Sequence, residues 1–253
     1  MLAHIDFYSK CLQMKTGINV LLPDEPKEPM AVLVLLHGLG DDENSWFTQT
    51  ALERYASQQS LVIITPRAER SYYQNNLAGQ RYFDYLCTEL LVKCRTWFNL
   101  NANVQQTFIG GLSMGGFGAA QAALLHPEIY NSAFLLSAAL DMPRSWRKNK
   151  ERELWYQTLF GSLQKLENSE SDLFNLVRAG NRESEKPYIW QLCGREDQFY
   201  QENCDFSRLL KQNGYQNLLI EVEGSHTWDV WDRAIVKVIA EIKRLVSDSE
   251  QLR

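Results

Sequence analysis

The sequence predicts an α/β fold in which helices flank a mainly parallel sheet. Short, unbroken apolar runs recur along the chain, as in residues 31–36 (AVLVLL), and such runs are typical of strands buried on both faces. Segments with helical spacing of apolar residues separate these runs, and this alternation indicates a parallel sheet covered by helices. The chain has 253 residues, 45% of them hydrophobic, which is enough for one large core without disulfide or metal support. We therefore expect a single domain over residues 1–253.

The first half of the chain starts with two strands that we expect to pair antiparallel, at residues 5–9 and 17–22. Apolar runs then predict the strands of the parallel core, and a spacing of 3.6 residues predicts the helices between them. In chain order these elements are a strand at 31–36, a helix at 48–58, a strand at 61–65, a helix at 83–98, a strand at 106–110, a helix at 115–125 and a strand at 132–137.

The second half of the chain contains an interruption of this alternation. Residues 141–186 are rich in charged and aromatic side chains and contain no clear strand, so we interpret them as a helical, cap-like insertion over the edge of the sheet. The alternation then resumes with a strand at 188–193, a helix at 201–212, a strand at 218–222 and a closing amphipathic helix at 231–246. The tail, residues 247–253, is expected to be frayed.

The charge balance and the cysteine content exclude several classes of protein. The 26 Lys and Arg residues against 31 Asp and Glu residues give a net charge of −5, and no basic stripe interleaved with aromatic residues occurs, so we expect no nucleic-acid partner. No stretch approaches the roughly 18 uncharged residues of a membrane-spanning helix, and no secretory signal is visible. The five cysteines are widely spaced and odd in number, which indicates neither a disulfide framework nor a structural zinc. These observations predict a cytoplasmic protein without a membrane partner.

The most informative motif is Gly111-Leu112-Ser113-Met114-Gly115, which lies directly between an expected strand and an expected helix. This is the context of a nucleophile elbow, a sharp turn that brings the residues two before and two after the serine close together. The turn would hold the Ser113 hydroxyl above the sheet, at the N-terminal end of a helix whose dipole favours developing negative charge. We therefore predict that Ser113 is a catalytic nucleophile.

A serine hydroxyl is a weak nucleophile and needs an adjacent general base, for which the chain offers four histidines. His4 precedes the core and His126 ends a helix. His37 follows a strand, where we expect it to shape a loop. His226 lies between the last strand and the last helix, where a loop at the carboxyl edge of the sheet is expected. We therefore predict that His226 is the general base.

The imidazole in turn needs a carboxylate that holds it in one tautomer and offsets its positive charge during the reaction. Asp197 and Glu196 both follow the strand at residues 188–193 and are close rivals for this role. We favour Asp197, because its shorter side chain one residue further along suits the loop. The chain order Ser113, Asp197, His226 is then that of α/β-hydrolases.

Attack on a carbonyl generates an oxyanion, which backbone amides can stabilise. One amide should be that of Met114, directly after the nucleophile. The other should come from the loop after residues 31–36, and we favour the Leu39 amide because Gly38 lets the chain turn inward there. The Gly40 amide is the alternative donor.

Five motifs, in this order and spacing, make the sequence resemble a known family over nearly the whole chain. The family comprises the small esterases related to bacterial tributyrin esterase and acetyl esterase and, more distantly, esterase D, which is also called S-formylglutathione hydrolase. The motifs are LLHGLGDDENSW (35–46), RYFDYLCTEL (81–90), FIGGLSMGGFGA (108–119), CGREDQFY (193–200) and EGSHTWDVWD (223–232).

The resemblance implies an α/β-hydrolase fold, a triad of Ser113, Asp197 and His226, and an oxyanion hole at Leu39 and Met114. It also implies hydrolysis of short-chain acyl esters, from acetyl to butyryl and including tributyrin, without a cofactor or a metal. The alternatives are a thioesterase of the S-formylglutathione hydrolase type and a carbohydrate acetyl or feruloyl esterase.

Three further expectations concern the substrate pocket and the assembly of the protein. We expect Trp146 and Trp155 of the insertion, and Trp228 beside the histidine, to line the pocket for a small-molecule ester. The pair His37-Gly38 departs from the usual esterase D pattern and favours the tributyrin-esterase side of the family. Relatives of this kind are often oligomeric, so a homo-oligomer is also expected.

Overall fold

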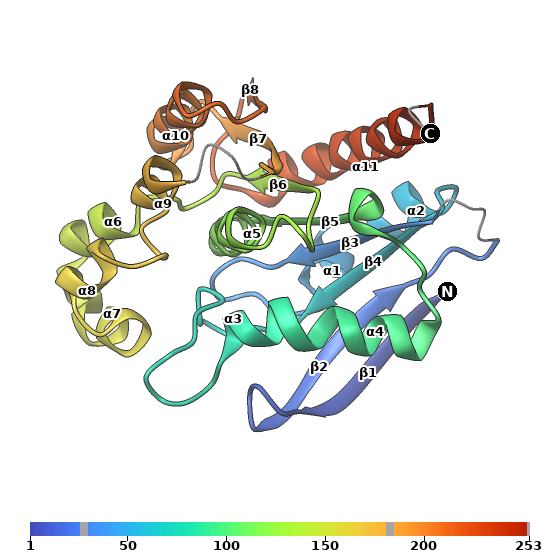
Figure 1. Ribbon diagram of the computed structural model, residues 1–253, viewed down its shortest axis with the longest axis horizontal. Helices are drawn as coiled ribbons and strands as arrows, with labels where there is room; N and C mark the ends of the chain where they lie inside the picture. The colour runs from blue at the N-terminus through green and yellow to red at the C-terminus, as the bar shows by residue number, and fades with distance from the viewer. Residues whose placement is uncertain (26–29, 181–184, 252–253) are drawn as a thin grey trace.

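The computed structural model describes residues 1–25, 30–180 and 185–251, and it confirms the α/β class (Figure 1). Within the described residues the strands form one sheet of eight, in the order β1-β2-β4-β3-β5-β6-β7-β8. β1 and β2 pair antiparallel, as do β2 and β4, and the other pairs are parallel. The strands are β1 (Leu2–Ser9), β2 (Met14–Leu21), β3 (Ala31–Leu36), β4 (Leu61–Pro66), β5 (Thr107–Leu112), β6 (Ser132–Leu136), β7 (Tyr188–Gly194) and β8 (Asn217–Val222).

Helices cover both faces of this sheet, which explains the unbroken apolar runs in its central strands. Alternate side chains of β3 enter two separate apolar clusters: Val32 and Val34 pack with α4 and α5, and Leu33 packs with α1, α2 and α11. None of the described helices is both long and apolar enough to cross a membrane. The α-helices are α1 (Ser45–Gln49), α2 (Leu52–Ala56), α3 (Tyr82–Asp84), α4 (Leu91–Phe98), α5 (Met114–Leu125), α6 (Met142–Lys148), α7 (Glu153–Phe160), α8 (Leu163–Glu167), α9 (Leu173–Ala179), α10 (Tyr200–Gln212) and α11 (Trp228–Gln251).

Two of the predicted helices differ from the structure in their course. The helix predicted at 48–58 is divided into α1 and α2, because the Ala51 amide donates to the carboxylate of Asp232 on α11 instead of continuing the helix (3.0 Å). The helix predicted at 83–98 is continuous but contains a π-helical segment, Tyr85–Leu90, between α3 and α4. Neither the break between α1 and α2 nor the π-helical segment can be predicted from the spacing of apolar residues.

The C-terminal tail also differs from the prediction. α11 continues to Gln251, so residues 247–251 are helical where we expected fraying, and residues 252–253 lie outside the described residues. The extra turn is supported by the ion pair between Arg244 and Asp248 (2.6 Å) and by the burial of Val246. The helix therefore continues beyond the last buried residue of its apolar face, Val246.

The helices α6 to α9 lie between β6 and β7, within the segment 141–186 that we interpreted as helical, and residues 181–184 of this segment lie outside the described residues. Figure 1 shows α6, α7 and α8 gathered at one end of the molecule, with both termini at the opposite end. Buried side chains of these helices, including Trp146, Tyr156 and Leu166, belong to the same apolar cluster that covers the α5 face of the sheet. The division of the chain into one domain with an insertion stays a prediction.

Candidate active site

Ser113 lies between β5 and α5 in a backbone conformation that is rare for a residue with a side chain. Its φ is 53° and its ψ is −112°, and such conformations persist only where the surroundings enforce them. The Ser113 amide donates to the Leu136 carbonyl (2.9 Å), while its carbonyl accepts from the amides of Phe117 and Ala139 (3.1 Å each). Hydrogen bonds to β6, to α5 and to the loop after β6 therefore fix the backbone of Ser113.

The glycines on either side of Ser113 meet the predicted steric requirement of the elbow. A Cβ atom at Gly111 would lie 2.6 Å from the backbone carbon of Gly115. A Cβ atom at Gly115 would lie 2.6 Å from the Leu36 carbonyl oxygen and 2.7 Å from that of His37. The turn can therefore close only where both positions lack a side chain.

We expect Gly115→Ala to lower the free energy of unfolding by about 2–4 kcal/mol, because the new methyl group meets rigid backbone atoms. Urea denaturation of the variant and the wild type measures this difference. Gly180→Ala is a suitable control, since a Cβ atom there would meet only the mobile end of the Tyr215 side chain within 3 Å. Equal stability of Gly115→Ala and wild type would contradict the close packing of the elbow.

The structure brings Asp197 and His226 together. The Nδ1 of His226 donates to Oδ2 of Asp197 at 2.8 Å, and the other carboxylate oxygen accepts from the Phe199 amide, also at 2.8 Å. The Asp197 carboxylate is fully buried, whereas Glu196 is exposed. Of the two rival carboxylates, Asp197, which we favoured from the sequence, is thus the partner of the histidine.

The loops that carry this pair pack directly against each other. The Arg195 amide donates to the Val222 carbonyl (2.8 Å) and the Glu196 amide to that of Gly224 (3.2 Å). A Cβ atom at Gly194 would lie only 2.0 Å from the Gly224 oxygen, so glycine is required for this approach. The ends of β7 and β8 therefore fix the distance between carboxylate and imidazole.

Two aromatic rings hold the imidazole of His226 edge-on, those of Phe199 (centroid distance 5.1 Å) and Trp231 (4.9 Å). With Nδ1 bonded to Asp197, the Nε2 atom faces away from the carboxylate. Sequence reasoning did not single out either ring, although Phe199 lies within the motif at 193–200 and Trp231 within the motif at 223–232. Among the described residues the Ser113 hydroxyl has no hydrogen-bond partner, so its contact with His226 stays a prediction.

The two amides predicted to form an oxyanion hole have no partner among the described residues. Leu39 follows β3, and Met114 is the first residue of α5. Neither amide donates a hydrogen bond to another residue in the part of the chain that the structure describes. The positive end of α5 lies at Met114, and the role of both amides as oxyanion donors stays a prediction.

His37 braces the loop that carries Leu39, as the sequence predicts. Its Nε2 accepts from the Ala68 amide (3.0 Å), so its Nδ1 is the protonated nitrogen and donates to the Gly38 carbonyl (2.8 Å). The imidazole is 1% exposed, and this burial lowers the pKa of His37. A neutral histidine with both nitrogens engaged acts as a fixed strut, not as a base.

The two tryptophans of the insertion differ in exposure. Trp146 is buried, stacks on Tyr156 (5.2 Å) and donates its indole hydrogen to Glu153 (2.7 Å). Trp155 is half-buried and meets Tyr72 edge-on at 5.6 Å. Trp155 therefore keeps more surface for a ligand than Trp146 does, and the role of both in substrate binding stays a prediction.

Trp228 lies at the start of α11 and is half-buried. Its ring meets those of Trp46 and Trp231 edge-on, at 5.2 Å each. Trp231 in turn contacts His226, so an aromatic row connects Trp228 to the imidazole. Its predicted contact with substrate is not tested by this geometry.

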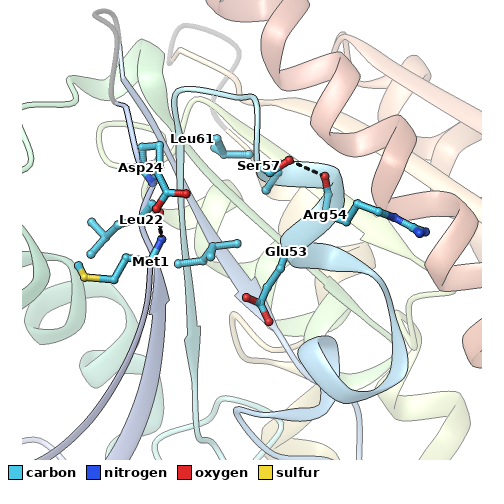
Figure 2. Close-up of a pocket in the computed structure, with 10 residues that line it drawn as sticks. Met1, Leu22, Asp24, Glu53, Arg54, Ser57 and Leu61 are labelled. Atoms are coloured by element: carbon cyan, nitrogen blue, oxygen red, sulfur yellow. Dashed lines mark hydrogen bonds and ion pairs between the residues drawn. The ribbon is translucent and has the colours of Figure 1, made fainter.

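A separate pocket of about 400 Å³ lies where β2 ends and α2 approaches it (Figure 2). Leu61, the first residue of β4, lines this pocket, whereas Ser113 follows the last residue of β5. The pocket is therefore at the amino edge of the parallel strands, opposite the edge where ligands of such sheets bind. Figure 2 shows the Met1 amino group paired with Asp24 at its wall.

The described residues contain no group of three or more His, Cys, Asp or Glu side chains that could hold a metal ion. All five cysteines are free, and four of them are buried.

The fold and this site define the class of the protein as a serine hydrolase of the α/β-hydrolase fold, and comparisons with known proteins agree. Residues 9–242 match the family described as "Putative esterase". The chain is 31% identical to the acetyl esterase of Caldicellulosiruptor saccharolyticus over 249 residues, and the match covers 91% of this chain and 94% of that protein. The protein therefore belongs to this esterase family and is a carboxylic ester hydrolase.

Two solved structures from Staphylococcus aureus are also similar. The fluorophosphonate-binding serine hydrolase F superposes with a TM-score of 0.86 and 28% identity, covering 96% of this chain and 98% of that one. The S-formylglutathione hydrolase superposes with a TM-score of 0.85 and 28% identity, covering 96% and 99%.

Proposed function

We propose that the protein is a serine carboxylesterase that works through an acyl-serine intermediate on Ser113. The hydrogen bond between Asp197 and His226 carries this proposal, because it fixes the tautomer that leaves Nε2 free to accept a proton. Ser113 Oγ attacks the ester carbonyl carbon while its proton passes to His226 Nε2. The C–O bond to the alcohol then breaks, and His226 returns the proton to the departing oxygen.

The second half of the reaction uses the same groups in the reverse sense. Water gives a proton to His226 and attacks the acyl carbon, and the bond to Ser113 breaks as the imidazole reprotonates its oxygen. The carbonyl oxygen becomes negative in both tetrahedral intermediates. The unpartnered amides of Leu39 and Met114 are our candidates for stabilising it, and each such donor typically contributes about 10²–10³ in rate.

We propose short-chain acyl esters, from acetyl to butyryl, as the substrate class. The support is the 31% identity to an acetyl esterase over nearly the whole chain. A specific observation favours thioesters as the second candidate: the structural similarity to an S-formylglutathione hydrolase at 28% identity. Both reactions need the same triad and differ only in the leaving group.

We expect kcat/KM to be highest for acetyl to butyryl p-nitrophenyl esters and to fall at least about tenfold by the octanoyl ester, because added methylenes exceed a pocket for short acyl groups. Steady-state kinetics with the acetyl, butyryl, hexanoyl and octanoyl esters measure this preference. A rising kcat/KM along the series would contradict the short-chain assignment.

Steady-state kinetics also distinguish an esterase from a thioesterase. S-formylglutathione and an acetyl ester are compared at matched concentration, since the ratio of kcat/KM values reports differential transition-state binding. A ratio far in favour of the thioester would replace our first candidate by the second.

The remaining parts of the proposal concern the surroundings of the enzyme. Free, mostly buried cysteines support a reducing compartment, and we propose a cytoplasmic location. The contribution of Trp146, Trp155 and Trp228 to the substrate pocket and the formation of a homo-oligomer stay predictions.

A further inference from the structure

Two neighbouring side chains in the first turn of α10 are polar and buried, although neither belongs to the proposed triad. Glu202 is 7% exposed and Asn203 is fully buried. Buried polar groups are costly unless they are hydrogen-bonded, so their partners indicate what they do.

Both side chains bind the loop that follows β6. Glu202 Oε1 accepts from the Leu140 amide (2.7 Å), and Asn203 Nδ2 donates to the Ala138 carbonyl (2.8 Å). Between these two residues lies Ala139, whose amide donates to the carbonyl of Ser113 (3.1 Å). The first turn of α10 thus fixes the two neighbours of Ala139 in the chain. Ala139 in turn helps to keep Ser113 in its strained conformation.

Asn203 also connects to the other half of the site. Its second amide hydrogen donates to the Phe199 carbonyl (2.9 Å). Phe199 in turn donates its own amide hydrogen to Asp197 and packs its ring against His226. One side chain therefore joins the loop after β6, which contacts Ser113, to the loop after β7, which carries Asp197 and Phe199.

We propose that Glu202 and Asn203 are positioning residues that set the placement of Ser113 relative to His226. This inference rests on the proposed function, because it assumes that Ser113 and His226 exchange a proton. Among the described residues, no hydrogen bond joins the side chains of Ser113 and His226. The distance between these side chains therefore depends on how the segments that carry them are held. A displacement of about 1 Å at such a site can cost about 10²-fold in rate.

The charge of Glu202 makes its hold on the loop dependent on pH. Burial raises the pKa of Glu202 to about 7, although the two backbone amides that it accepts from act in the opposite direction. The titratable or charged groups around it are Asp141 and Arg144 at the start of α6, Tyr72 and Cys193. A carboxylate is a stronger acceptor than a neutral carboxyl group, so the loop is held more firmly above pH 7 than below it.

The first test replaces Asn203 with alanine and uses Ser207→Ala as the matched control. Ser207 is also a buried polar residue of α10, but its hydroxyl accepts from Asn217 (2.7 Å), away from the loop after β6. We expect Asn203→Ala to lower kcat for p-nitrophenyl butyrate about 10- to 100-fold with KM changed less than about threefold. The rate of fluorophosphonate labelling at Ser113 should fall in parallel, whereas Ser207→Ala should keep both rates. A loss in Asn203→Ala no larger than in Ser207→Ala would overturn the proposal.

A second comparison keeps the inference testable if Asn203→Ala does not fold. Glu202→Gln retains an oxygen that accepts from the Leu140 amide, whereas Glu202→Ala does not. We expect Glu202→Ala to lose about tenfold in kcat and Glu202→Gln to recover most of it. The ratio of wild-type to Glu202→Gln kcat should rise from pH 6 to pH 8, because only the wild type gains the carboxylate.

Equal kcat in Glu202→Ala and wild type would refute the role of Glu202, and a constant ratio across this pH range would refute the dependence of that role on the charge of Glu202. Failure of the proposed function looks different: the wild type itself would then not be labelled at Ser113.

Discussion

Ser113→Ala is expected to lower kcat for ester hydrolysis about 10⁴- to 10⁶-fold, the range seen when the nucleophile of a serine hydrolase is removed. The reason is that no acyl-enzyme can form, and the remaining groups can only polarise the ester and orient water. The hydroxyl has no hydrogen-bond partner among the described residues, so its removal leaves no protein group unpaired. Steady-state kinetics with p-nitrophenyl butyrate measure the effect, and thermal unfolding should show an intact fold.

Ser132→Ala provides the matched control for this variant. Ser132 is a buried serine in β6, and its hydroxyl donates to its neighbour Asn131 (2.7 Å). It should keep kcat within about twofold. Substantial hydrolysis by purified Ser113→Ala would mean that another group carries the acyl chemistry.

Asp197→Asn is expected to lower kcat about 10³- to 10⁴-fold while leaving the fold intact. An asparagine can present its amide hydrogens to the imidazole and favour the wrong tautomer, and it cannot offset the positive charge that forms on His226. The carboxylate is fully buried, so this electrostatic contribution is not screened by solvent.

Glu196→Gln is the matched control, because it makes the same chemical change one residue earlier on an exposed side chain. Its kcat should stay within about twofold of the wild type. If Glu196→Gln lost activity and Asp197→Asn kept it, the assignment of Asp197 as the carboxylate of the triad would be wrong. The two variants are to be compared at the same pH.

Much of the site could be predicted from the sequence because its signals are local. The elbow is specified by two glycines around Ser113 and by the strand and helix that flank it, and all of these lie within residues 107–125. The bond between Asp197 and His226 follows from chain order and from the loops at the carboxyl ends of β7 and β8. The choice between Asp197 and Glu196, however, depends on how one loop turns, which no local pattern encodes.

Features that depend on distant partners could not be predicted. Glu202 and Asn203 bind backbone groups about 60 residues earlier in the chain, and backbone groups leave no trace in the sequence. The break between α1 and α2 similarly depends on Asp232 of α11, whose carboxylate accepts a hydrogen bond from the Ala51 amide. Tertiary contacts of this kind override local helical spacing.

The position of a covalent adduct tests the central role of Ser113 most directly. The protein is treated with a fluorophosphonate, and the adduct is located by mass spectrometry of tryptic peptides. The peptide expected to carry it spans residues 96–144 and also contains Ser132 and Ser137. We predict one adduct per chain, on Ser113, with loss of esterase activity in proportion to labelling. An adduct on a different residue, or full activity after complete labelling of Ser113, would contradict the account.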